Sequence, residues 1–184
     1  GVQLDEAAFP VLLASTLQAH GALDGIPIED MIGRALGFIA REGPASGQDR
    51  WEEDAGLNTF TLAIAISALV AGSQFLSPKA RGLALRLADC WNWHLEDWTF
   101  VQNTSLAAEI GVEGHYIRTG PEDVLTQDRA RSETVAIKNL ADDPELPADV
   151  QVETHFLQLI RYGLRQADDQ AILDSVKVID QLLK

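Results

Sequence analysis

Two adjacent carboxylates, Glu52 and Glu53, directly follow the aromatic residue Trp51 in a short polar segment between two apolar stretches. Neighbouring carboxylates repel each other when both are ionised, so one of them tends to keep its proton to higher pH, and a ring that excludes water acts in the same direction. A carboxylic acid that is protonated near neutral pH can protonate a departing oxygen. The pattern is therefore compatible with general acid chemistry of the kind that cleaves glycosidic bonds, although paired acids by themselves are more often structural.

The same acidic segment has a second interpretation. Asp and Glu are favourable at the start of a helix, because they interact with the positive end of the helix dipole, and a solvated acidic helix start needs no catalytic role. Trp51 favours the chemical interpretation, since sugars bind on aromatic faces through their C–H groups while carboxylates bind their hydroxyls. The glycines and proline between Gly43 and Gly56 indicate a turn region and not a helix interior.

The elements that must position this segment are predicted to be helices. Apolar residues recur at three- and four-residue steps, which predicts helices over residues 5–19, 29–41, 58–75, 77–98, 150–166 and 168–183. The third of these is apolar on almost all sides, which is typical of a helix surrounded by other helices. Pairs of long helices joined by short turns indicate an all-α fold of helical hairpins, stacked in a solenoid or closed into a toroid.

A long irregular connection interrupts this helical pattern. Glycines and prolines break the periodicity between about residues 99 and 148, where only residues 105–110 show a weak helical pattern. Long connections in compact domains often carry function.

Composition excludes several classes of partner and site. The chain has 184 residues and a net charge of -14, and its basic residues are scattered. Nucleic-acid binding is disfavoured, because phosphate contacts need clusters of Lys and Arg. The longest apolar stretch is too short to span a bilayer, so no membrane partner is expected. The four histidines lack metal-ligand spacing, and the single cysteine excludes an intramolecular disulfide.

Five segments together carry a resemblance to one family. The most specific is GPASGQDRWEEDAGLNTFTLAIAISALV, residues 43–70, which resembles the general-acid segment of the glucoamylase and glucodextranase family of inverting glycoside hydrolases. The others similar to that family are GVQLDEAAFPVLLA, CWNWHLEDWTF, GHYIRTGP and VETHFLQLIRYGLRQADD. The similarity covers almost the whole chain, and it implies an all-α fold of helical hairpins forming part of an (α/α)6 toroid.

The resemblance implies specific roles for the acidic segment. It makes Glu52 the general acid, Glu53 a substrate-binding carboxylate and Trp51 part of the wall of the sugar site. It has Asp49 orient the neighbouring loop or assist electrostatically. No metal and no organic cofactor is implied, and the substrate is an α-glucan or oligosaccharide.

The N-terminal segment has two interpretations. By resemblance, Gln3 and Asp5 form an adjacent wall of the pocket and bind substrate. The alternative is helix capping, because Asp5 followed by apolar periodicity is also the signature of a helix N-terminus. Both interpretations stay open at this stage.

Some parts that the family uses are missing from the sequence. An inverting glycosidase needs a second carboxylate as base, roughly 6.5–9.5 Å from the acid. No segment after Val150 resembles the family's base segment, and the upstream loop that grips the terminal glucose has no counterpart. About three hairpins are present, whereas a closed toroid needs six. We therefore expect residues 1–184 to form a single partial toroid domain, the central part of a larger catalytic domain, with little activity alone.

Two functional hypotheses follow. The first is part of an exo-acting α-glucosidase that inverts the anomeric centre. The second is a non-catalytic helical-hairpin module for binding or interaction, which the missing base favours. In either case apolar faces without neighbouring hairpins predict self-association. The start without Met fits an excised piece, so the compartment stays undetermined, with a secreted or periplasmic full-length protein among the options.

Overall fold

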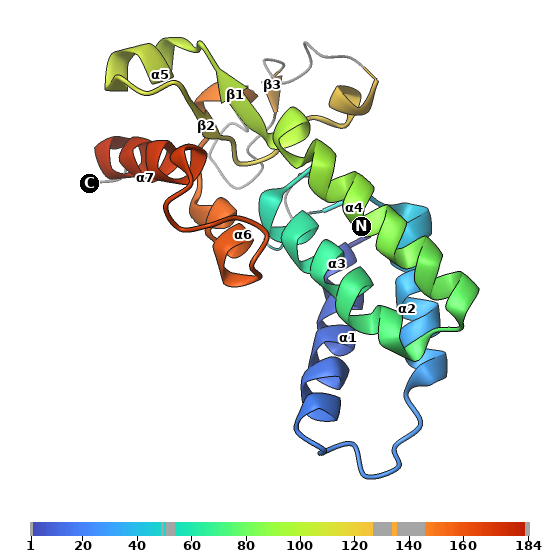
Figure 1. Cartoon of the computed structure of the whole chain (residues 1–184). Coiled ribbons are helices and arrows are strands. Elements are labelled where there is room, and N and C mark those ends of the chain that lie inside the picture. Colours follow the sequence, from blue (N-terminus) through green and yellow to red (C-terminus); the bar gives the residue numbers. More distant parts are fainter. Residues whose placement is uncertain (1, 49, 51–53, 127–133, 136–145, 183–184) are drawn as a thin grey trace.

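The computed structural model of the chain is mostly helical and describes residues 2–48, 50, 54–126, 134–135 and 146–182. The α-helices in this part of the chain are α1 (Leu4–Ala19), α2 (Glu29–Glu42), α3 (Thr59–Gly72), α4 (Pro78–Thr99), α5 (Ser105–Ile110), α6 (Leu157–Arg161) and α7 (Gln170–Leu182) (Figure 1). Two short antiparallel pairs of strands accompany them, β1 (Phe100–Gln102) with β2 (Gly114–Tyr116), and β3 (Thr134–Val135) with β4 (Leu146–Pro147). The predicted all-α class is confirmed.

Most of the predicted helices are observed, with one clear exception. The prediction of a single helix over residues 150–166 is wrong, because the backbone there forms 3-10 turns at Ala148–Val150 and Thr154–Phe156 and is α-helical only over α6. The backbone of Gln151 is extended and accepts a hydrogen bond from the Arg118 amide at 2.7 Å. A tertiary hydrogen bond therefore replaces local helical hydrogen bonds here. The apolar periodicity of this stretch indicates which residues are buried, but it does not indicate a helix.

Helix α3 is the centre of the fold. It packs against α1, α4 and α6, and α2 packs against α1. Eleven of the 14 residues of α3 are buried, which confirms that other helices surround it. The three N-terminal helices approach closely at Gly72, where an added Cβ would lie 2.5 Å from a Val11 methyl group and 2.9 Å from a Leu36 methyl group. A side chain at this position would force the helices apart.

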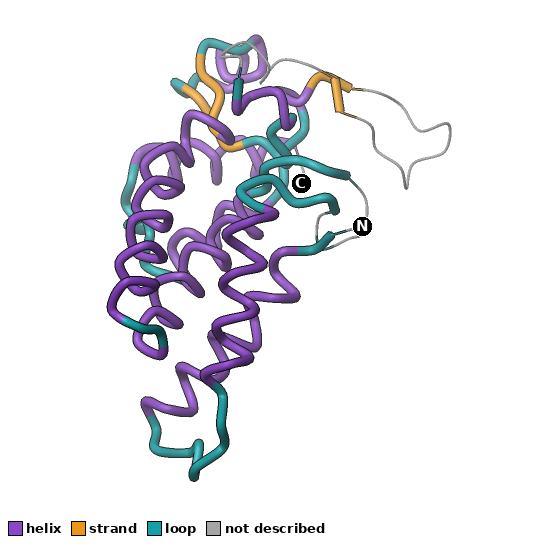
Figure 2. The backbone as a smooth tube through the Cα atoms, turned by 90° about the vertical axis from the view of Figure 1, so that its right-hand side faces the viewer, coloured by secondary structure: helices purple, strands orange, loops and turns teal. Residues whose placement is uncertain are grey.

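The ends of the helices differ in character. Figure 2 shows the turn between α1 and α2 at one end of the helices and the strands and loops at the other. The segments that precede α1, α3 and α6 meet through hydrogen bonds, from the Leu4 amide to Ser46 Oγ at 3.3 Å and between Asn58 and His155 at 2.6 Å. We call this end of the molecule, with the loops before α1, α3 and α6, the N-terminal pole.

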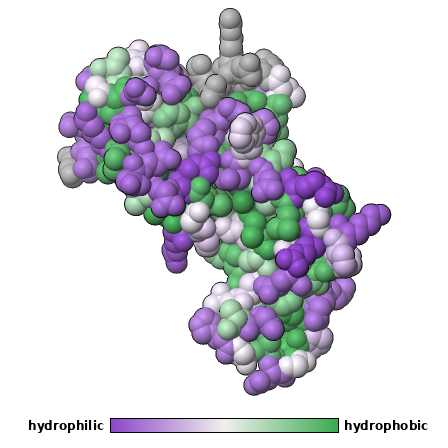
Figure 3. Space-filling model, in the orientation of Figure 1, coloured by the Kyte–Doolittle hydropathy of each residue, from purple (hydrophilic) through white to green (hydrophobic). Residues whose placement is uncertain are grey.

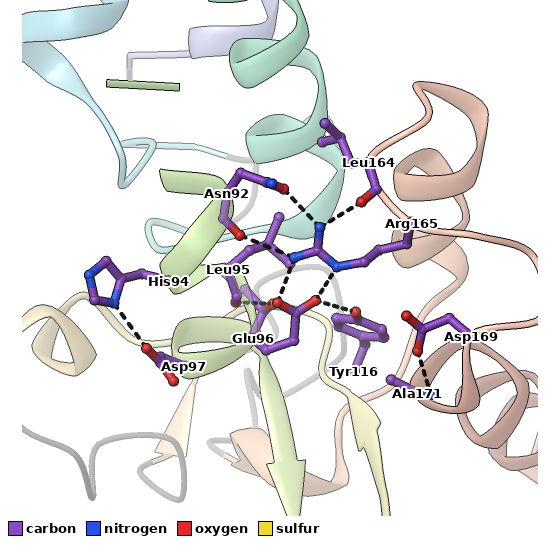
Figure 4. Close-up of polar contacts among 11 residues, drawn as sticks. Asn92, His94, Leu95, Glu96, Asp97, Tyr116, Leu164, Arg165, Asp169 and Ala171 are labelled. Carbon is purple, nitrogen blue, oxygen red and sulfur yellow. Dashed lines mark hydrogen bonds and ion pairs between the residues drawn. The ribbon is translucent and has the colours of Figure 1, made fainter. Parts of the chain in front are cut away.

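A second polar cluster joins helix α4 to distant parts of the chain. Arg165 donates to Glu96 Oε2 at 2.6 Å and to Asn92 Oδ1 at 2.8 Å, and the Tyr116 hydroxyl donates to Glu96 Oε1 at 2.6 Å (Figure 4). Burial, helped by the charge of Glu96, raises the pKa of the Tyr116 phenol, which therefore stays a neutral donor. This cluster ties α4 to β2 and to the loop before α7.

Large apolar side chains also reach the surface (Figure 3). On α1, Phe9 is 43% exposed and Leu13 60% exposed, and on α7 Leu173 is 46% exposed. Exposed apolar faces of this kind mark surfaces that associate, so self-association stays a prediction with a structural basis. In the described part of the chain, the helices are too short or too polar to cross a membrane.

Candidate active site

The predicted site residues are only partly visible. Four of the six lie outside the described residues: Asp49, Trp51, Glu52 and Glu53. Gln3 and Asp5 are described, and so are the residues that flank the acidic segment on both sides. The described flanking residues lie at the N-terminal pole, and their own contacts can be followed.

The acidic segment is part of a loop whose base is closed by paired backbone. Ser46 and Gly56 exchange two hydrogen bonds of 2.9 Å, so residues 47–55 form a loop between them. The buried Ser46 hydroxyl lies 2.7 Å from the carbonyl oxygen of Gln48 and 3.1 Å from that of Val2, and it accepts a hydrogen bond from the Leu4 amide. The N-terminal segment therefore lies directly beside the loop. We call residues 47–55 the acid loop.

Asn58, three residues after the acid loop, joins the start of α3 to two distant segments. Its Oδ1 caps the first turn of α3, accepting from the amide two residues on at 2.9 Å. Its Nδ2 donates to the carbonyl oxygen of Arg118 at 2.8 Å and to Nδ1 of His155 at 2.6 Å. The adjacent Leu57 exchanges two hydrogen bonds of 2.8 Å with Gly120. The start of α3 is thus fixed by residues 60 and 97 positions away along the chain.

A buried ion pair holds the C-terminal side of the acid loop. Arg118 Nη2 lies 2.5 Å from Asp54 Oδ2, and the two residues are only 8% and 5% exposed. Arg118 Nε also donates to Gln151 Oε1 at 3.2 Å. Burying two charges costs desolvation energy, and a close ion pair with further hydrogen bonds offsets that cost. Asp54 is therefore firmly held only two residues after Glu52.

The middle of the acid loop packs on an aromatic residue. The guanidinium carbon of Arg50 lies 4.5 Å from the centre of the Phe60 ring, a cation–π contact. The Phe60 ring also contacts Phe9, with ring centres 6.3 Å apart, and His155, with ring centres 5.7 Å apart. Glu52 therefore lies between two residues with anchored side chains, Arg50 and Asp54.

Gln3 and Asp5 lie beside this loop, in the segment that Ser46 binds. Gln3 is the N-cap residue of α1, has extended backbone and makes no side-chain capping hydrogen bond. Asp5 lies inside the first turn of α1 and is not its N-cap residue, so the prediction that Asp5 caps this helix is wrong. A role for both residues in binding substrate stays a prediction, which their position next to the acid loop supports.

The carboxylate of Asp5 is buried and only partly compensated. It is 5% exposed, and its Oδ1 accepts no hydrogen bond from the described residues. Burial raises the pKa of Asp5, and the amides of Asp5 and Glu6 and the charge of Arg50 offset part of this effect. Because the folded chain binds this proton more tightly than the unfolded chain, stability falls as the pH rises from the unfolded pKa through the folded pKa.

Replacing Asp5 with Asn is therefore expected to increase the free energy of unfolding of the 184-residue chain at pH 7. Asn has the same shape and can still accept from the backbone amides, but it carries no buried charge. The gain should shrink as the pH falls towards 4, because the pKa of Asp5 is raised in the folded state and the buried carboxyl therefore takes up its proton before the unfolded one does. Urea unfolding between pH 4 and 7 measures this, with the exposed Asp89→Asn as control. A D5N chain less stable than wild type at pH 7 would contradict the electrostatic account.

Sequence reasoning missed several residues that build the site. Asp54, Asn58, Gln151 and His155 are buried polar residues with long-range partners. Asn58 carried a local signal, since Asn directly before an apolar helix is a typical N-cap. The pairing of Asp54 with Arg118 had none, because 64 residues separate them.

In the part of the chain that the structure describes, no group of three or more His, Cys, Asp or Glu residues is arranged to hold a metal ion. The described part of the site consists of the residues that flank the acidic segment, with Asp54 held by a buried ion pair and Asn58 by buried hydrogen bonds.

Comparisons with known proteins show the family and the fold of the chain. A glucoamylase from Clostridium sp. (strain G0005) is 28% identical over 193 residues, an alignment that covers 100% of this chain and 25% of that protein. The crystal structure of a bacterial glucoamylase complexed with acarbose matches 99% of this chain and 25% of its own chain, with 26% identity and a TM-score of 0.81. The chain thus spans about a quarter of the length of these relatives, and its helices match the (α/α)6 fold of glucoamylase. A family model described as "Glycosyl hydrolases family 15" matches residues 1–183, and the chain therefore belongs to glycosyl hydrolases family 15.

Proposed function

We propose that this chain is the acid-bearing part of a glucoamylase-like enzyme, which hydrolyses α-glucosidic bonds from non-reducing ends with inversion. The observation that carries the proposal is the anchored acid loop: family membership covers the whole loop, and described residues on both sides of Glu52 are held in place. A general acid needs such a fixed position, because proton transfer requires hydrogen-bond distance to the leaving oxygen.

In this proposal Glu52 is the general acid. It donates its proton to the glycosidic oxygen while the bond from that oxygen to the anomeric carbon breaks, and positive charge develops on the sugar ring. Glu53 binds a sugar hydroxyl, and Trp51 offers an aromatic face to the ring. The neighbouring Glu53 carboxylate also favours the protonated form of Glu52, since the negative charges of adjacent carboxylates repel each other.

The remaining predicted residues line the pocket. Gln3 and Asp5 form the wall beside the acid loop, a role that the hydrogen bonds of Ser46 to the N-terminal segment support. Asp49 orients the loop or contributes to its electrostatics. The substrate is an α-glucan or a related oligosaccharide, in keeping with the acarbose bound to the bacterial glucoamylase of similar fold.

The catalytic base belongs to another part of the protein in this proposal. Inversion needs a second carboxylate roughly 6.5–9.5 Å from the acid, with a water molecule between them. Since the chain spans about a quarter of its relatives, we place the base outside residues 1–184. Residues 1–184 are then one partial toroid domain within a larger catalytic domain.

The stereochemistry of the product tests this function. We expect the full-length protein to release the non-reducing-end glucose of maltose as the β-anomer, observed by proton NMR before mutarotation as an initial excess of β-glucose over the anomeric mixture that the reducing-end glucose contributes, and the 184-residue chain alone to release none. An initial excess of α-glucose would contradict inversion, and turnover by the 184-residue chain would contradict the proposal that the base lies elsewhere. Binding of acarbose by the full-length protein without any hydrolysis would instead support a non-catalytic binding module.

A further inference from the structure

We propose that Arg118 is a positioning residue for the general acid, acting through its ion pair with Asp54. This inference rests on the proposed function, because it concerns the position of Glu52. Arg118 belongs to the segment after β2, far from the acid loop in sequence, and no part of the general-acid motif contains it. Its role follows from the contacts of its guanidinium group and of its backbone.

The contact with the acid loop is close and buried. Arg118 Nη2 and Asp54 Oδ2 are 2.5 Å apart, and both side chains are almost fully excluded from solvent. Charge-assisted hydrogen bonds of this kind are stronger than neutral ones, and they are weakly screened when buried. Asp54 is therefore held in one position, two residues after Glu52 in the sequence.

Arg118 is itself held from two further directions. Its backbone amide donates to the carbonyl oxygen of Gln151 at 2.7 Å, and its Nε donates to Gln151 Oε1 at 3.2 Å. Its carbonyl oxygen accepts from Asn58 Nδ2 at 2.8 Å. Because both the main chain and the side chain are fixed, the guanidinium group is a rigid anchor and cannot follow a moving loop.

Gln151 extends this anchor to the β3–β4 hairpin. Its Nε2 donates to the carbonyl oxygens of Val135, at 2.8 Å, and Leu146, at 2.9 Å. One continuous set of hydrogen bonds thus runs from the acid loop through Arg118 to both strands of the hairpin. A network in which each member is satisfied specifies one geometry, since any shift leaves a buried group unpaired.

The short distance along the chain makes this geometry relevant to catalysis. Glu52 precedes Asp54 by two residues, so their Cα atoms are at most about 7 Å apart. On the other side Arg50 is held against Phe60. A misplacement of about 1 Å in a reacting group costs roughly 100-fold in rate. Loss of the Arg118–Asp54 pair should therefore reduce proton donation even if the fold is retained.

A substrate that does not need the proton separates positioning from stability. In maltose the departing oxygen must be protonated as the C1–O bond breaks. In α-glucosyl fluoride the C1–F bond breaks and fluoride leaves as a stable anion, while water supplies the oxygen that adds to C1. A variant with a misplaced acid should therefore lose activity on maltose and keep most of its activity on the fluoride.

We would measure kcat and KM of the full-length protein on both substrates for Arg118→Met, Asp54→Asn and Arg118→Lys. For R118M and D54N we expect kcat on maltose to fall about 10- to 100-fold with little change in KM, and kcat on the fluoride to stay within about threefold. R118K retains the charge and a donor group but not the planar guanidinium, so compared with R118M it should restore part of the activity on maltose. Equal losses on both substrates would overturn the inference.

Two reference variants make the result specific. Arg165→Met removes another partly buried arginine. Arg165 Nη2 lies 2.6 Å from Glu96 Oε2 in the cluster on α4, which does not include the acid loop (Figure 4). This variant should change both activities by the same factor. Glu52→Gln should show the selective loss on maltose in its strongest form. If E52Q shows that loss and D54N does not, the positioning role is wrong and the proposed function stands. If E52Q itself does not show it, the proposed function fails.

A variant that does not fold is handled by the double substitution. Removing one partner leaves an uncompensated buried charge, whereas removing both does not. The D54N/R118M protein should therefore regain stability, measured by thermal unfolding, and still show the selective loss on maltose. Recovery of full activity on maltose in this double variant would also overturn the inference, because no positioning contact would be left.

Discussion

Replacing Glu52 with Gln in the full-length protein is expected to lower kcat on maltose by about 100- to 10,000-fold, the usual contribution of a positioned general acid. Gln has nearly the same shape as Glu but has no acidic proton to donate. KM should change little, because the proton transfer takes place only in the transition state. Initial rates of glucose release measure this effect.

The pH dependence of the same variant provides a second measurement. In the wild-type protein the rate should fall at alkaline pH as the general acid loses its proton, and E52Q should lack this alkaline limb. The exposed Glu109→Gln on α5 is the matched control, and it should have wild-type rates at every pH. Unchanged kcat in E52Q would mean that the acidic segment has only a structural role, namely that of a solvated acidic helix start.

Replacing Asn58 with Ala is expected to have the largest effect on stability, a loss of about 3 to 7 kcal/mol in the free energy of unfolding. The substitution removes the cap of α3, which contributes about 1 kcal/mol. It also leaves the carbonyl oxygen of Arg118 and Nδ1 of His155 buried and without this donor, at about 1–3 kcal/mol each. The loss in the free energy of unfolding measures how much the Asn58 side chain contributes to the stability of the N-terminal pole.

Urea unfolding of the 184-residue chain measures this loss. Ser77→Ala is the matched control, because Ser77 caps α4 through a single exposed hydrogen bond of 3.5 Å to the Ala80 amide. It should cost about 1 kcal/mol or less. If N58A and S77A had the same effect, the bonds of Asn58 to Arg118 and His155 would contribute nothing, and the account of the pole as a connected network would be wrong.

The geometry of this network also assigns a proton. Since Asn58 Nδ2 is a donor, His155 Nδ1 must accept and the ring proton belongs on Nε2, which lies 3.0 Å from Glu153 Oε1. Glu153 lies close to this nitrogen but is not oriented to accept a hydrogen bond from it, so the hydrogen bond between Asn58 and His155 is what links the start of α3 to the segment before α6. It explains why a polar histidine, 4% exposed, is tolerated against the Phe60 ring.

The accuracy of the helix predictions follows from the range of the interactions that form each helix. For α1 to α4 and α7 the apolar spacing and the local stop signals were sufficient, because helical hydrogen bonds join residues four apart. The failure over residues 150–166 has the opposite cause. Phe156 and Leu159 are buried and spaced as in a helix, but the bond from Arg118 to Gln151 holds the preceding backbone extended.

The amino-acid sequence by itself determined the helical class, the central buried helix and the acidic motif with its family resemblance, since each of these depends on a sequence pattern only a few residues long. Only the tertiary structure decided which distant polar groups meet. The pairs Asp54 with Arg118 and Asn58 with His155 join positions 64 and 97 residues apart. No local period encodes such pairs, because they form only when the packed helices bring their loops to one end and exclude water from the groups between them.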